Sequence, residues 1–143
     1  MVKASVKWLE GAAFVAESGS GHALVMDGPA DHGGRNLGPR PMEMLLMGMG
    51  GCASVDVIGI LEKSRQKVSS CVAQLSAERA DGVPAVFTEI SLHFVVSGTG
   101  LKEASVKRAV ELSAEKYCSA SIMLARSGAT IRHSYEIVEV QGA

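Results

Sequence analysis

Residues 41–65, PMEMLLMGMGGCASVDVIGILEKSR, decide how the rest of the sequence is interpreted. Pro41 suits the first turn of a helix, where its missing N–H is not needed. Glu43 follows in that turn and Lys63 lies in the last turn, so both charges complement the helix dipole. Apolar residues occupy nearly every side of the segment. We therefore predict a long helix over 42–64 that is buried on almost all of its surface.

The same segment raises the question of a membrane span. Its run from 44 to 61 is apolar except for Ser54 and Asp56, which approaches the ~18 residues that indicate such a span. A central carboxylate is costly in a bilayer, and four glycines interrupt the run. We therefore predict a buried helix of a soluble protein, with no membrane partner. Because one small domain provides too little cover for such a helix, we expect a homodimer.

Length and composition favour one globular domain. The chain has 143 residues, of which 47% are hydrophobic and 20% are charged, and its formal net charge is −1. These values fit a single domain over residues 1–143 and exclude a disordered chain. Few aromatic side chains and no basic stripe are available to bind nucleic acid, so none is expected as a partner. The first residues lack the apolar core of a secretion signal, so we expect a cytoplasmic protein.

The remaining segments predict an α+β fold, with strands and helices segregated rather than alternating as βαβ units. Between residues 3 and 27, three short alternating stretches predict an antiparallel meander, and a Gly/Pro-rich loop follows over 28–41. After the long helix, we expect a hairpin of strands 68–79 and 85–96 with its turn at 80–82, an amphipathic helix over 101–117, a short helix to about 126 and a final strand over 130–140.

Two finer expectations concern the helices that follow the hairpin. Ser119 or Ser121 is expected to cap the short helix. The apolar face of the amphipathic helix is expected to contain Val106, Ala109, Val110, Ser113 and Tyr117, with Glu103, Lys107, Glu111 and Glu115 on the opposite face.

Three cysteines at wide spacings fit neither a disulfide framework nor a metal motif, so we expect reduced thiols. Cys52 lies in mid-helix, with Asp56 one turn further on the same face. Cys118, in KYCSAS, lies between two predicted helices, where N-terminal amides can stabilise a thiolate. For both thiols the alternative is simple core packing, and for Asp56 it is a salt bridge or cap rather than reaction chemistry. Cys71 has no motif around it and is expected to be structural.

Two further kinds of site are not expected. The glycines of GMGG lack the strand–loop–helix context of a phosphate-binding loop. The histidines are scattered without metal-ligand spacing, so we expect neither a metal nor another cofactor. The methionines at 42, 44, 47 and 49 indicate core filling or an apolar pocket near Cys52.

The segment PMEMLLMGMGGCASVDV, with Cys118 in EKYCSAS 66 residues after Cys52, resembles the two-cysteine signature of the OsmC/Ohr family. Within that family the sequence is nearest the YhfA-like subgroup, and the resemblance covers nearly the whole chain. It implies an OsmC-like α+β fold assembled as an intertwined homodimer. In such a dimer, two long central helices are wrapped by the sheets of both subunits, and the active site lies between the subunits.

For function, the resemblance implies that a thiolate reduces organic hydroperoxides. The residues that match the family's cysteine pair are Cys52 and Cys118. Cys52 would attack the distal peroxide oxygen and become a sulfenic acid, with which Cys118 would form a disulfide. A thiol or dithiol reductant would then restore both thiols. Because apolar surroundings raise the pKa of a thiol, Cys52 needs a nearby cation to react as a thiolate.

The sequence departs from the active members of the family at two supporting positions. Those members place an arginine in the N-terminal hairpin and a glutamate ten residues before the first cysteine. Here no arginine precedes Arg35, and Met42 occupies the glutamate position, so we expect Glu43 as its substitute and Arg35 or Arg40 as the cation. The alternative function is that of a dimeric redox sensor or binding protein for an apolar molecule, without peroxidase turnover.

Overall fold

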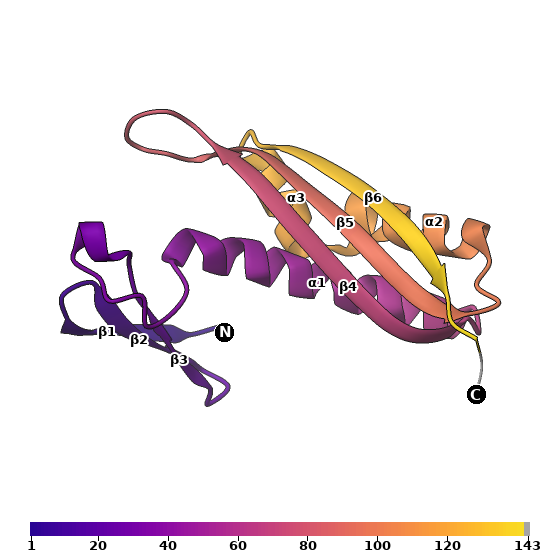
Figure 1. The fold of residues 1–143 in the computed structure, drawn as a ribbon, viewed down its shortest axis with the longest axis horizontal. Helices are drawn as coiled ribbons and strands as arrows, with labels where there is room; N and C mark the ends of the chain where they lie inside the picture. Colours follow the sequence, from indigo (N-terminus) through magenta and orange to yellow (C-terminus); the bar gives the residue numbers. More distant parts are fainter. Residues whose placement is uncertain (142–143) are drawn as a thin grey trace. The chain divides into compact units, whose positions relative to one another are not determined.

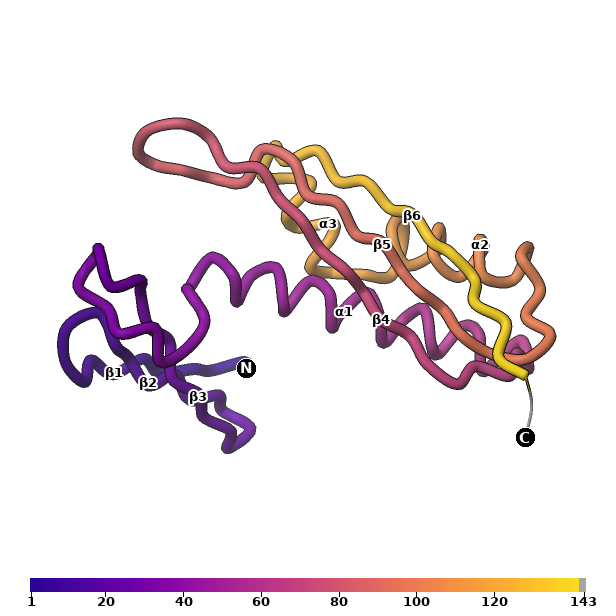
Figure 2. Tube along the Cα trace, in the orientation of Figure 1, coloured from indigo at the N-terminus to yellow at the C-terminus, as the bar shows by residue number. Residues whose placement is uncertain are grey.

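The computed structural model describes residues 1–141. The chain divides into two compact units, one over residues 1–47 and the other from residue 48 onward, and each is described by itself. The elements of both units are labelled in Figure 1, and the path of the chain is traced in Figure 2.

The first unit contains the predicted meander. Strands β1 (Ala4–Glu10), β2 (Ala13–Ser18) and β3 (Ala23–Met26) form an antiparallel sheet in the order β1-β2-β3. A short 3-10 turn, η1 (Ala30–His32), follows in the Gly/Pro-rich loop. The prediction of three antiparallel strands followed by a loop is thus confirmed.

One buried carboxylate, which sequence reasoning passed over, organises that loop. Asp27 is 2% exposed, its Oδ1 accepts the N–H of Gly28, and its Oδ2 accepts the N–H groups of Arg35 and Leu37. These bonds, the one from Gly28 most of all, hold the pKa of Asp27 below its ordinary value of 3.8, although burial acts in the opposite direction. The loop is therefore fixed by satisfied backbone amides rather than by an apolar core.

The second unit is built on a sheet of three long strands in the order β4-β5-β6: β4 (Lys67–Arg79), β5 (Phe87–Thr99) and β6 (Thr130–Glu139). β5 contributes the centre of the core, because Leu92, Phe94 and Val96 alternate along one face and are fully buried. Helices α2 (Glu103–Leu112) and α3 (Ser119–Arg126) lie behind the sheet in Figure 1. They are joined by a π-helical turn, η2 (Ser113–Tyr117).

The α+β class is confirmed, but one connection differs from the expected segregation. β4 and β5 pair antiparallel, as predicted, whereas β5 and β6 pair in parallel. The helices α2 and α3 therefore form the crossover connection between the parallel strands β5 and β6. An antiparallel pair can be joined by a tight turn and needs no such crossover. The hairpin loop is also longer than predicted: it runs from Ala80, whose N–H bonds the carbonyl of Val86 at 2.8 Å, and β5 begins at residue 87 rather than 85.

The long helix α1 spans Pro41–Lys63, close to the predicted 42–64. Its fully buried side chains form one stripe at four-residue spacing: Met49, Ala53, Val57 and Leu61. Gly50 lets the helix lie close to β4, since a Cβ there would come within 2.7 Å of Leu75 Cδ1. The prediction that nearly every side is buried is wrong for a single chain, because Val55 is 73% exposed. By length and composition alone α1 is also able to cross a membrane, a test that core helices of soluble proteins pass as well.

The amphipathic face of α2 is confirmed for all predicted members but one. Val106, Ala109, Val110 and Ser113 are buried, whereas Tyr117 is 49% exposed. The reason lies in η2, where the N–H of Cys118 bonds the carbonyl of Ser113 at 2.9 Å. This i→i+5 bond widens the turn, so that Tyr117 is rotated away from the face that Ser113 occupies.

Candidate functional site

Cys118 lies at the junction of η2 and α3 and is completely buried. Its Sγ accepts two hydrogen bonds from Ser121, one from the backbone N–H at 3.4 Å and one from the hydroxyl at 3.0 Å. The thiol itself therefore caps α3. The prediction that Ser119 or Ser121 is the cap is wrong, because Ser119 is already the first helical residue and Ser121 lies within the first turn.

The structure brings the Cys118 thiol to the Cys52 thiol. Burial raises the pKa of Cys118, and although the bonds from Ser121 lower it, hydrogen bonding and charge interaction with Cys52 raise it further. Cys52 is half-buried on α1, and both residues are free thiols. Two thiols from elements far apart in the sequence thus face one another. Cys71, on β4, is a half-buried free thiol whose pKa is raised by burial.

Asp56 is held by a residue that sequence reasoning placed in the core without assigning it a role. The Ser113 hydroxyl is bonded to the carbonyl of Ala53 at 3.2 Å and to Asp56 Oδ2 at 3.3 Å. Because the carbonyl of Ser113 also accepts the N–H of Cys118, this serine ties α1 to the turn that presents the buried thiol. Asp56 thus makes a structural contact, a hydrogen bond to the turn that follows α2, and its role in the reaction stays a prediction. A serine five residues before Cys118 had no signal of its own in the sequence.

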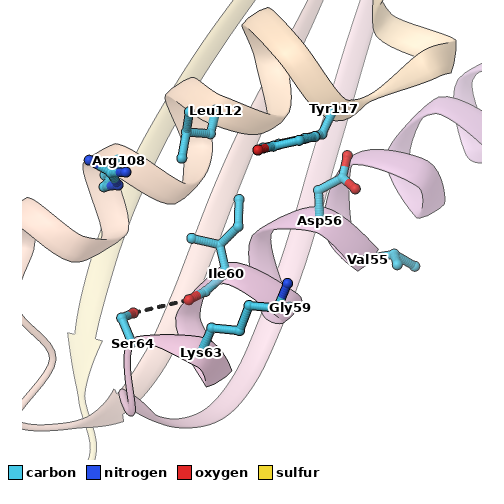
Figure 3. Close-up of a pocket in the computed structure, with 9 residues that line it drawn as sticks. All are labelled: Val55, Asp56, Gly59, Ile60, Lys63, Ser64, Arg108, Leu112 and Tyr117. Atoms are coloured by element: carbon cyan, nitrogen blue, oxygen red, sulfur yellow. Dashed lines mark hydrogen bonds between the residues drawn. The ribbon is translucent and has the colours of Figure 1, made fainter.

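A groove of about 470 Å³ lies between α1 and the α2–η2 segment, next to this cluster. Figure 3 shows Ile60 pointing from α1 toward Leu112, with Asp56 and Tyr117 toward one end and Arg108 toward the other. Lys63 extends along α1 past Gly59. The groove is mainly apolar, with charged groups at its edges. The expected methionines do not line it.

The three supporting residues expected from the loop and the helix start belong to the first unit and have partners there. Arg35 forms an ion pair with Glu10. The guanidinium of Arg40 donates to Asn36 Oδ1 at 2.6 Å and to the carbonyl of Gly38 at 3.2 Å. Glu43 Oε1 accepts the backbone N–H of Arg40 at 2.8 Å, so the carboxylate stabilises the start of α1. Within residues 1–141, no group of three or more His, Cys, Asp or Glu side chains is placed to hold a metal ion.

Comparison with known proteins shows which family this chain resembles. The sequence pattern of the OsmC-like protein family matches residues 32–134. The chain is 50% identical over 137 residues to Protein YhfA of Escherichia coli strain K12. The aligned region covers 96% of this chain and 98% of that protein.

Two solved structures share the fold at low identity. The OsmC-like protein of Mycoplasma pneumoniae has a TM-score of 0.82 at 17% identity, covering 96% of this chain and 97% of the other. The organic hydroperoxide resistance protein OsmC of Legionella pneumophila has a TM-score of 0.72 at 17% identity, covering 95% and 96%. The family match and the identity to YhfA together show that the chain belongs to the OsmC-like protein family.

Proposed function

We propose that this protein is a thiol-dependent peroxidase that reduces organic hydroperoxides. The observation that carries the proposal is the pairing of Cys52 on α1 with Cys118 at the start of α3. Two facing thiols can pass from dithiol to disulfide without a cofactor, which supplies the two electrons that cleavage of a peroxide bond requires. The Legionella pneumophila relative is itself called an organic hydroperoxide resistance protein.

The atoms and electrons of the proposed reaction balance with Cys52, Cys118 and an external reductant. The Cys52 thiolate attacks the distal peroxide oxygen, the O–O bond breaks, and the alkoxide leaves and is protonated to an alcohol. Cys52 is then a sulfenic acid, oxidised by two electrons. Cys118 attacks the Cys52 sulfur, hydroxide leaves as water, and a disulfide forms. Two thiol groups of an external reductant return both residues to thiols.

The environments of the two thiols support different roles for them, with Cys52 as the thiolate that attacks the peroxide and Cys118 as the thiol that then forms the disulfide. Cys118 is buried and has a raised pKa, so it remains protonated near neutral pH until a neighbouring sulfenic acid is available. Cys52 is half-buried, which leaves room for a peroxide to approach. We propose that Arg40 or Arg35 supplies the cation that the Cys52 thiolate needs, with Glu43 and Asp56 in supporting, structural roles.

We propose a cytoplasmic homodimer as the working form. Side chains such as Val55 and Leu45 leave α1 with an exposed apolar surface, at 73% and 49% exposure. Burying a Val or Leu side chain completely is worth about 1.5–3 kcal/mol, so a second copy on this helix gains several kcal/mol. No other class of partner is needed to cover it.

The groove beside the thiols favours a second candidate function, the binding of an apolar molecule coupled to redox sensing. Ile60, Leu112 and Val55 line a space of about 470 Å³, a size suited to a small ligand. In this alternative, the thiols form a disulfide without turnover. The two functions differ in whether oxidation of the thiols is followed by repeated peroxide consumption.

The test is peroxide consumption by purified protein with cumene hydroperoxide and dithiothreitol. We expect turnover faster than with hydrogen peroxide, since the groove between α1 and the α2–η2 segment is mainly apolar. Cys52→Ser should abolish turnover, Cys118→Ser should stop after one equivalent unless an outside thiol resolves the sulfenic acid, and Cys71→Ser is the matched control that should keep the wild-type rate. Consumption that persists in Cys52→Ser, or its absence from the wild type with every thiol tried, favours the binding function instead.

A further inference from the structure

A second cavity of the 48–141 unit, of about 600 Å³, lies between α2, α3 and β6. Its apolar lining comes mainly from the two helices, and Glu111, Glu115 and Arg126 add charged groups. Ser121 and His133 also line it. As far as the structure describes the chain, its lining includes no residue of α1, the helix that contains Cys52.

Two polar groups that line this cavity are buried, the hydroxyl of Ser121 and the Nε2 of His133. Ser121 is 1% exposed, and its hydroxyl is the group that donates to Cys118 Sγ at 3.0 Å. The cavity thus reaches to within one side chain of the buried sulfur. His133 Nε2 is buried and has no hydrogen-bond partner within residues 1–141. A buried polar atom without a partner costs free energy, so its presence requires an explanation.

The geometry of thiol–disulfide exchange connects these facts to Cys118. The attacking sulfur, the attacked sulfur and the leaving sulfur lie in line. A thiol must therefore approach the sulfur that it attacks from the side opposite the leaving sulfur, and this access decides which sulfur of the disulfide reacts. An attack on Cys118 with Cys52 as leaving group must come from the side of Cys118 opposite α1. The cavity between α2, α3 and β6 lies beyond Ser121 and is free of α1 residues, whereas the groove in Figure 3 is lined largely by α1.

We propose that the cavity between α2, α3 and β6 admits a small thiol or dithiol reductant, which attacks Cys118 of the Cys52–Cys118 disulfide while His133 accepts the thiol proton. The proposal rests on the proposed thiol chemistry and adds to it a separate route for the reductant. The peroxide reaches Cys52 from one side, and the reductant reaches Cys118 from the other.

The exchange is balanced in atoms and electrons. The reductant sulfur bonds to Cys118 Sγ, the bond between the two cysteines breaks, and Cys52 leaves as a thiolate. The thiol proton moves to His133 Nε2. A second thiol group then attacks the reductant's sulfur, which yields the oxidised reductant and a Cys118 thiolate that recovers the proton from His133. The proton of the second thiol is released to solvent. Burial lowers the pKa of His133, so its ring is neutral near pH 7 and able to accept the proton.

The charges around the cavity narrow the class of reductant. The lining of the cavity contains two carboxylates, those of Glu111 and Glu115, and one guanidinium, that of Arg126. The ion pair between Glu111 and Lys107, at 3.8 Å, is exposed and therefore weak, so it offsets little of the negative charge. A neutral or cationic alkyl thiol is thus favoured over a thiol that carries a carboxylate or sulfonate. Cysteamine and mercaptoethanesulfonate are two small probes of opposite charge, to be compared at equal thiolate concentration.

The experiment measures reduction of the preformed disulfide in the full chain, with the disulfide generated by diamide. Ala125, exposed on α3 at the cavity wall, is replaced by Trp to fill the space; Met123→Trp on the same helix, 71% exposed and outside the lining, is the matched control. We expect reduction by dithiothreitol to slow at least tenfold in Ala125→Trp and to be unchanged in Met123→Trp. Oxidation by cumene hydroperoxide should proceed at the same rate in both.

Two further readouts identify the attacked sulfur and the charge preference. Acid quenching during reduction by cysteamine, followed by peptide mapping, should find the mixed disulfide on Cys118. Glu115→Arg should shift the preference from cysteamine toward mercaptoethanesulfonate, and it does so without filling the cavity.

An adduct on Cys52, or an Ala125→Trp protein that is reduced at the wild-type rate, overturns this inference even if peroxidase activity is intact. Because diamide makes the disulfide independently of peroxide, a protein without peroxidase activity still gives a decisive answer. The proposed function and the proposed route for the reductant therefore fail separately.

Discussion

Ser113→Ala is the substitution that tests whether the tie between α1 and η2 positions the buried thiol. It removes a hydroxyl that is completely buried and that bonds Asp56 Oδ2 and the carbonyl of Ala53. A hydrogen bond to a charged group is worth roughly 1.5–3 kcal/mol, and Ala recovers up to about 0.5 kcal/mol in helix propensity. Since Asp56 is only partly buried, we expect a net loss of about 1–2.5 kcal/mol.

For a chain of this size, that loss lowers the melting temperature by about 3–8 °C. The measurement is thermal unfolding at one fixed protein concentration, so that any effect of assembly is held constant. Ser105→Ala is the matched control, because Ser105 lies on α2, the helix that leads directly into Ser113, and its hydroxyl bonds to no residue among 1–141. We expect this control to melt within about 1 °C of the wild type.

The same substitution should affect chemistry at Cys118, whose N–H bonds the carbonyl of Ser113. A sub-ångström loosening of a reacting group is costly, so we expect the peroxide-driven disulfide to form roughly tenfold more slowly, while alkylation of Cys52 keeps its rate. Asp56→Asn keeps an acceptor but removes the charge and should give a smaller loss. A Ser113→Ala protein with wild-type melting and wild-type disulfide formation refutes the reasoning, as does full additivity of the two substitutions in a double-mutant cycle.

Three further predictions concern other parts of the chain. The lowered pKa of Asp27 favours its charged form in the folded state, so its contribution to stability is present above pH 3.8 and is lost as the pH falls through the lowered folded value; Asp27→Asn should lack that part of the acid-induced fall in melting temperature. Val55→Glu should convert a dimer to monomers in sedimentation, because it places a charge on a helix surface that we propose is covered; an unchanged dimer contradicts that placement. Of Arg40→Ala and Arg35→Ala, the one that raises the pH at which Cys52 is alkylated identifies the cation, and no shift in either removes both from the proposed mechanism.

The sequence was sufficient for elements whose patterns are local. The helix α1 was predicted within one residue at each end, because Pro41 and Lys63 mark its ends chemically. The meander, the two long strands of the hairpin and the amphipathic face of α2 follow from simple periodicities. The burial of α1 was overestimated, since composition reports how apolar a helix is and not how much of it one chain can cover.

The candidate site was predictable only in part. Cys52 and Cys118 were found by their motifs, but Ser113 and Ser121 received no role in the site, since serine is common and a bond to a carboxylate or a thiol leaves no trace in the sequence. The cap of α3 was assigned to serine because hydroxyls are the usual caps. A thiol performs it here, and its capping geometry became visible only once the π-helical turn was known.

The cavity proposed for the reductant depends on a feature that no local pattern contains, the parallel pairing of β5 and β6. This pairing sets His133 opposite Leu92, so both side chains lie on the face that the helices cover. With the same residues paired antiparallel, His133 would lie opposite Val95, whose side chain is on the other face of the sheet. Because the crossover through α2 and α3 returns the chain to the beginning of β5, His133 comes to line the same cavity as Ser121, whose hydroxyl donates to the buried Cys118 Sγ. The proposed route to Cys118 from the side opposite Cys52 therefore depends on the direction of a single edge strand.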